Sequence, residues 1–167
     1  MVTKWLAGQT ETADRLNDNH AVTLDFSAIQ ASTAMSASTT ELVALTTPTI
    51  TFRNGRAFRL VFKGLMQNSV ASDQGDVRIR KTNSTTSPTL LDSFRFNLAA
   101  SGTYGFYFES IVINTSGADI AVPLVGTFAR ATGTGNINLF ASATNPVYLH
   151  TEDIGNSDDY PNAATLT

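Results

Sequence analysis

Two histidines, His20 and His150, are the residues best suited to acid–base chemistry in this 167-residue chain, but no catalytic motif surrounds either of them. A Gly-x-Ser-x-Gly sequence, which presents a nucleophilic serine on a sharp strand-to-helix turn, is absent. Asp73 and Asp76 form a carboxylate pair in a polar stretch, where two ordinary loop charges are the simpler interpretation. The sequence therefore predicts no catalytic residues, and we expect that the protein is not an enzyme.

Oxygen ligands for a cation gather only near the end of the chain, at Asp153, Asn156 and Asp158. Their spacing does not match a calcium loop of the EF-hand type, and no glutamate closes the segment. Cysteine is absent, which excludes disulfides and thiolate metal sites. The Gly-Thr-Gly sequence at 133–135 lacks the lysine that follows in a phosphate-binding loop. We therefore expect neither a metal nor another cofactor.

The charges are few and unevenly placed. The formal net charge is −3, which argues against general nucleic-acid binding. Of 11 basic residues, eight lie between residues 53 and 95, whereas the segment from residue 150 onward holds four acidic residues and no basic one. One interpretation is a solvated face balanced by the acidic tail. The other is a docking surface for an acidic partner or for the acidic tail of a neighbouring copy, for which the candidates are Arg53, Arg56, Arg59, Arg78 and Arg80.

Strand patterns dominate the chain after residue 20. In residues 49–64 two alternating apolar runs flank Asn54 and Gly55, a pair that favours a tight hairpin turn. About ten short runs of this kind, separated by turn residues, predict an all-β antiparallel jelly-roll sandwich. The alternation assigns to the core Phe52, Phe58, Leu60, Phe62, Val77, Ile79, Phe94, Phe96, Phe106 and Phe108. Residues 20–167 would form this domain, with a loose acidic tail after residue 155.

One strand breaks the simple rule, because residues 104–114 are apolar on both faces. Tyr104, Phe106 and Phe108 alternate with a second set, Tyr107, Ile111 and Ile113. A strand with two apolar faces is covered on both. The second set therefore predicts a subunit interface, and closed symmetry favours a homotrimer.

Residues 1–19 differ from the rest and predict a separate N-terminal arm with one or two helical turns. Trp5, the only tryptophan, lies there with Leu6 and Leu16. So short an amphipathic helix does not hold together alone in water, so it must dock on something. Two alternatives stay open: a strap on its own domain, or an anchor on another protein through Trp5, Leu6 and Leu16. No signal-peptide run or membrane span is present, so we expect synthesis in the cytoplasm and no membrane partner.

Both ends of the chain resemble structural proteins of tailed phages of actinobacteria. The sequence KWLAGQTETADRLN at 4–17 resembles the tryptophan-containing start of many such proteins. NPVYLHTEDIG at 145–155 is similar to the last strand of their small β-rich virion proteins. The strand pattern of the middle resembles the trimeric jelly rolls of tumour necrosis factor and the head of the first complement component, and SGTYGFYF at 101–108 is similar to their Gly-x-Tyr-x-Phe strand.

This resemblance implies an accessory protein of the phage virion, made in the host cytoplasm. The leading expectation is a capsid decoration protein that binds the major capsid protein, or another virion protein, and stabilises the head. The alternative is a tail-fibre or tail-tip component whose head binds a host surface glycan. A glycan binder should expose aromatic rings for sugar stacking, and Tyr160 is the sequence's main candidate because most other aromatics lie in alternating strands.

Overall fold

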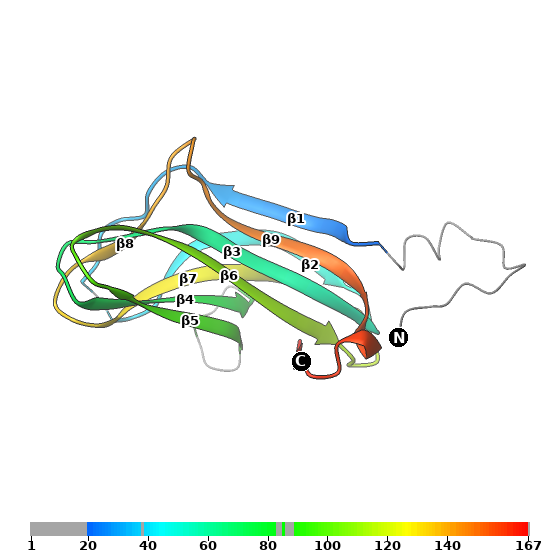
Figure 1. Ribbon diagram of the computed structural model, residues 1–167. Coiled ribbons are helices and arrows are strands. Elements are labelled where there is room, and N and C mark those ends of the chain that lie inside the picture. Colours follow the sequence, from blue (N-terminus) through cyan, green and yellow to red (C-terminus); the bar gives the residue numbers. More distant parts are fainter. Residues whose placement is uncertain (1–19, 38, 83–84, 86–88, 167) are drawn as a thin grey trace, which may run out of the picture.

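The protein is a two-layer β-sandwich in the computed structural model, which describes residues 20–37, 39–82, 85 and 89–166. The expected arm of residues 1–19, including Trp5, Leu6 and Leu16, lies outside the described residues. Figure 1 shows the strands stacked as two layers. The all-β sandwich expected from period-two alternation is therefore confirmed, because apolar residues on one side of each strand need a second sheet to cover them.

Sheet A contains six strands and sheet B contains four. Along sheet A the order is β1 (Val22–Ile29), β9 (Val147–Asn156), β3 (Arg56–Asn68), β6 (Gly102–Asn114) and β10 (Ala164–Thr165), and β8 (Ile137–Phe140) pairs with the far end of β3. Along sheet B the order is β2 (Leu42–Phe52), β7 (Ile120–Thr132), β4 (Asp73–Lys81) and β5 (Leu90–Leu98). All pairings between these strands are antiparallel except that of β10 with β6.

The expected hairpin over residues 49–64 is wrong. β2 pairs with β7 in sheet B, whereas β3 pairs with β6 and β9 in sheet A. Asn54 and Gly55 therefore carry the chain from one sheet to the other. Gly55 has a φ of +74°, so the positive φ expected from the Asn-Gly pair is present. Alternation of apolar residues indicates which side of a strand is buried, but it does not indicate which strand pairs with it. The apolar side chains of both runs in residues 49–64 do point into the core.

Hydrogen bonds join this crossing to the loop between β6 and β7. The Asn54 backbone N–H donates to the Asp119 carboxylate at 2.9 Å, and the Gly117 N–H donates to the Asn54 side-chain oxygen at 2.9 Å. The buried Asn114 side-chain amide donates to the Phe52 carbonyl at 2.8 Å. The two connections between the sheets thus support one another at one end of the sandwich.

The core lies between the sheets and is built from aromatic and aliphatic side chains. Phe52 meets Phe58 edge to face with ring centroids 4.9 Å apart, and Phe62 meets Phe106 at 5.1 Å. The predicted core members that are buried are Phe52, Phe58, Leu60, Phe62, Val77, Ile79, Phe106 and Phe108. A methyl group on Gly126 would come within 2.9 Å of the Phe62 ring, so the two sheets approach closely at this point.

Two phenylalanines of β5 depart from the expected core. Phe96 is only partly buried, and Phe94 keeps 43% of its surface exposed, so the prediction for Phe94 is wrong. Phe94 is nevertheless on the inward side of sheet B, as the alternation predicts. It lies opposite the buried Val77, and its ring stacks on Phe96 and Phe108. β5 is the last strand of sheet B, so no further strand of the described residues covers its rings.

The C-terminal segment, expected as a loose tail, packs along sheet A. A 3-10 turn at Ser157–Asp159 follows β9, and β10 then runs parallel to β6. The Leu166 N–H donates to the Ile113 carbonyl at 2.8 Å, and the Leu166 side chain is fully buried. The last residues therefore complete the core at this edge of the sheet.

Candidate functional site

The five arginines proposed as a docking surface do not share one face. Arg56 and Arg59 belong to β3 in sheet A, and Arg53 precedes that strand, whereas Arg78 and Arg80 belong to β4 in sheet B. Sequence spacing could not reveal this, because it does not say which sheet a strand joins. A single basic face built from these five side chains is therefore excluded.

The sheet A arginines are matched with carboxylates of β9. The Arg56 guanidinium lies 2.7 Å from the Asp153 carboxylate, which is 1% exposed, and Arg53 reaches the same carboxylate at 3.2 Å. Arg59 donates to Glu152 at 2.7 Å from Nε, and this hydrogen bonding raises the pKa of Arg59 above its ordinary value. Two of the four acidic residues that follow residue 150, Glu152 and Asp153, therefore neutralise arginines within the same chain.

The sheet B arginines form a second, denser network. Arg80 donates to both oxygens of Glu41 at 2.5 and 2.6 Å, and Arg78 donates to Glu41 at 2.8 Å. Arg78 also donates to Asp76 at 2.6 Å, and Arg95 donates to the same carboxylate at 2.6 and 2.9 Å. We call Glu41, Asp76, Arg78, Arg80 and Arg95 the ionic network of sheet B.

Glu41 is the centre of this network. Its side chain is 8% exposed, and it also accepts a hydrogen bond from the Thr127 hydroxyl. Burial alone would raise the pKa of Glu41. The hydrogen bonds from Arg80 and Thr127 and the positive charges of Arg78 and Arg80 outweigh burial, so the pKa lies below its ordinary value of 4.5. Glu41 therefore stays ionised and holds the two arginines on the outside of sheet B.

The outer face of sheet A presents aromatic rings instead. Strand register places Tyr107, Lys63, Tyr148 and Ala28 in one row across β6, β3, β9 and β1. The next row contains Glu109, Val61, His150 and Phe26. Tyr107 is 59% exposed and Phe26 is 56% exposed, the two largest values among the exposed large hydrophobic side chains described. We call the outward residues Phe26, Lys63, Tyr107, Glu109, Tyr148 and His150 the aromatic face.

Contacts between neighbouring side chains hold the rings of the aromatic face in place. The Phe26 ring lies 4.8 Å from Tyr148 and 5.8 Å from His150, measured between centroids. The Lys63 ammonium lies 5.8 Å from the Tyr148 centroid, a cation–π distance. The Tyr107 hydroxyl donates to Glu109 at 3.0 Å, and this hydrogen bond raises the pKa of Tyr107. The rings are thus oriented before any ligand arrives.

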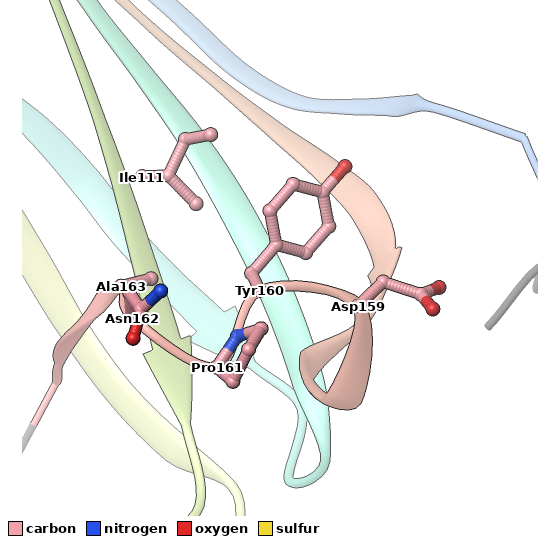
Figure 2. Close-up of a pocket in the computed structure, with 6 residues that line it drawn as sticks. All are labelled: Ile111, Asp159, Tyr160, Pro161, Asn162 and Ala163. Carbon is pink, nitrogen blue, oxygen red and sulfur yellow. The ribbon is translucent and has the colours of Figure 1, made fainter.

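A shallow pocket adjoins this face where the C-terminal segment crosses β6. It is about 270 Å³ in volume and is lined by Ile111 and by residues 159–163. Figure 2 shows the Tyr160 ring standing beside Ile111, while the Asp159 carboxylate points away from the pocket. Ile111 shares the outer side of β6 with Tyr107, so the pocket and the aromatic face form one continuous surface.

The three residues expected at a subunit interface have different surroundings. Tyr107 is exposed on the aromatic face, Ile111 lines the pocket, and Ile113 is buried beside β10. The C-terminal segment of the same chain therefore lies against two of the three. The C-terminal segment therefore covers the second apolar face of residues 104–114 at Ile111 and Ile113. At Tyr107 no described residue covers this face.

Several residues of the aromatic face were not singled out from the sequence. Phe26 lies in an alternating run and was not among the predicted core residues, and Val22, Leu24 and Phe26 are all exposed. Tyr148 and His150 alternate with the buried Val147 and Leu149. The sequence signal that could have revealed this face was the pair of rings, Tyr148 and His150, on the outward side of one strand. The outward side of an antiparallel strand is normally polar, so two rings there are unusual.

Comparisons with solved structures include a distant likeness to a viral protein. No protein-family model matches the sequence, and no curated protein matches it by sequence either. A chain of the solved structure of infectious bursal disease virus, Gx strain, is similar with a TM-score of 0.41 and 13% identity. The likeness covers 87% of this chain and 42% of that chain. Within the described ranges, the structure has no helix of the length and apolarity required to cross a membrane.

Proposed function

We propose that this protein is a structural component of a phage virion, and that it decorates the outer surface of the capsid. In this proposal residues 1–19 attach the chain to the major capsid protein, and the sandwich is displayed outside. The resemblance of residues 4–17 and 145–155 to actinobacteriophage virion proteins supports this role. The jelly-roll connectivity implied by the same resemblance is part of the proposal.

The observation that supports the proposal is that the described residues bury a core of their own. The first described strand begins at Val22, and the large, fully buried side chains lie between Phe52 and Leu149. Leu166 packs with this core between the two sheets. In this proposal Trp5, Leu6 and Leu16 are the large apolar side chains that contact another protein.

A particle-binding assay tests the anchor. Particles lacking this protein are mixed with the full chain, with a variant lacking residues 2–18, and with Trp5→Ala, and bound protein is measured after sedimentation. We expect full binding by the intact chain and loss of binding by both variants, while the thermal unfolding transition stays nearly unchanged. Unfolding of the truncated chain would instead make residues 1–19 a strap on their own sandwich. Undiminished binding by it would contradict an anchor in this segment.

The aromatic face favours a second candidate function, a receptor-binding head on a tail fibre or tail tip. Rings exposed on a flat sheet are available to an external ligand, which a purely stabilising protein would not need. Copy number separates the two candidates, because decoration requires hundreds of copies per virion and a tail part only a handful. Quantitative mass spectrometry of purified particles would measure it.

A homotrimer with Tyr107 as the exposed residue of its interface is an alternative that would compete with ligand binding at this ring. Light scattering of the purified protein at micromolar concentration tests it. A trimer that is lost in Tyr107→Ala would support the interface. A monomer at all concentrations, and on the particle, would exclude it.

A further inference from the structure

We propose that the aromatic face and the adjoining Tyr160 pocket together form a binding site for an uncharged glycan. The inference deepens the receptor-binding candidate and rests on it for its biological role. The binding measurement below uses the purified protein, so it is independent of where the protein sits on the virion.

The shape of the surface suits a chain of sugar rings. Tyr107 and Tyr148 lie in one row on strands separated by β3, so their positions differ by two strand spacings, about 10 Å. That separation is about twice the length of one pyranose unit, so it fits two sugars with one residue between them in an extended oligosaccharide. The exposed rings of Tyr107 and Phe26 offer apolar surface, against which the C–H groups of a pyranose pack, and Tyr148 supports the Phe26 ring. The Tyr160 pocket then receives the end of the chain or a substituent on it.

Polar groups lie between the rings, where sugar hydroxyls would be. Glu109 beside Tyr107 accepts hydrogen bonds, and Lys63 between the two tyrosines donates them. His150 adds a ring nitrogen that is already within 3.2 Å of the Thr23 hydroxyl. Hydroxyl groups both donate and accept, so a mixture of carboxylate, ammonium and imidazole groups can satisfy them.

The charge of the surface decides against a polyanion. Lys63 and Arg59 contribute two positive charges to the outer side of sheet A, Glu109 and Glu152 contribute two negative ones, and Asp159 adds a further negative charge at the adjoining pocket, so positive charge is not in excess. Arg59 is already hydrogen-bonded to Glu152. A nucleic acid or a sulfated glycan requires an excess of positive charge along its path. A balanced surface is complementary to a neutral polymer.

The alternation of charged and aromatic side chains on the aromatic face argues against a second copy of this chain as its binding partner. The buried centres of stable protein interfaces are depleted in charged residues. Here Lys63 lies between Tyr107 and Tyr148 within a single row. Covering this row with protein would bury a charge between the rings, whereas a hydrated sugar leaves it partly in contact with water.

A glycan array carrying neutral oligosaccharides and polysaccharides, with heparin and single-stranded RNA as polyanions, tests the proposal. The strongest hit is then titrated with the purified full chain and its variants. We expect binding to a neutral glycan, and a roughly tenfold or greater loss of affinity in Tyr107→Ala and in Phe26→Ala, as for truncation of a central aromatic contact. Tyr107→Phe, which keeps the ring, should retain most of the affinity.

Phe94→Ala is the matched control, because Phe94 is an exposed ring that belongs to sheet B. It should bind the glycan as the unmodified chain does. Absence of binding to every neutral glycan would overturn the proposal, as would binding to heparin or RNA alone. An equal loss of affinity in Phe94→Ala would also overturn it, because the loss would then not belong to the aromatic face. Concentration-dependent dimerisation that is abolished by Tyr107→Ala, without glycan binding, would assign the surface to a second copy.

Discussion

The outer side of sheet B is covered by charges that pair with one another, whereas the outer side of sheet A exposes rings. On sheet B, Glu41 and Asp76 bind three arginines, and Val125, Thr127 and Ala129 beneath them are buried. On sheet A, Tyr107 and Phe26 leave more than half of their surface in solvent. The same period-two alternation thus produces a closed outer surface on one sheet and an open one on the other.

This difference separates stability from function. An ion pair that is largely buried costs several kcal/mol when one partner is removed, because the other charge is left without compensation. A ring that is mostly exposed contributes little to folding, because little of its area leaves water. The sheet B network should therefore matter for the free energy of unfolding, and the aromatic face for contacts with other molecules.

The largest expected effect belongs to the core that both sheets share. Phe62→Ala removes a fully buried ring that packs on Phe106 and against Gly126. We expect a loss of about 4 kcal/mol in the free energy of unfolding, the usual range for a buried phenylalanine. Denaturant unfolding measures it, with Phe62→Leu as the milder control. A loss under about 0.5 kcal/mol, typical of surface positions, would show that the inward register is wrong.

The sheet B network is the next test. Glu41→Ala leaves Arg78 and Arg80 without their shared carboxylate, so we expect a loss of about 3 kcal/mol in the free energy of unfolding. The matched control is Glu109→Ala on sheet A, where an exposed carboxylate bonds Tyr107 and the expected change is under about 0.5 kcal/mol. Equal losses at the two glutamates would remove the distinction between the two outer faces.

Acid should weaken the same network. The pKa of Glu41 is lowered in the folded state, so its ionised form stabilises the fold fully above the ordinary value of 4.5. This stabilisation is lost as the pH falls from 4.5 through the lower folded-state pKa. The difference in free energy of unfolding between the unmodified chain and Glu41→Gln should therefore shrink at acidic pH. A difference that stays constant between neutral pH and about pH 3 would show that the charge of Glu41 is not what stabilises the network.

Predictions from the sequence were most successful for the question of which side of a strand is buried. They were least successful for the question of which strands pair with one another. Alternation correctly predicted the inward residues of β3, such as Phe58 and Phe62, because burial acts on each residue separately. It failed for the Asn54–Gly55 hairpin, because apolar runs facing one another across a sandwich have the same pattern as two strands bonded side by side. Pairing depends on contacts far apart in sequence, which local pattern does not encode.

The surface was predicted less well for the same reason. The arginine cluster was visible in the sequence, but its division between two sheets depends on topology. The aromatic face brings Phe26, Lys63, Tyr107 and Tyr148 together from four strands. Each of these residues has an ordinary neighbourhood in the sequence, so only the register of sheet A reveals that they form one row or adjacent rows.

The smallest expected effect completes the comparison of the two faces. Tyr107→Ala should change the free energy of unfolding by less than about 0.5 kcal/mol, because the ring is 59% exposed and its hydrogen bond to Glu109 is also exposed. The measurement is the same denaturant titration used for Glu41→Ala, under identical conditions. A ring that stabilises the sandwich would lower the unfolding midpoint when it is truncated. A loss of about 2 kcal/mol or more, roughly the stabilisation that burial of a large side chain contributes, would mean that Tyr107 is part of the packed structure and not available to a ligand.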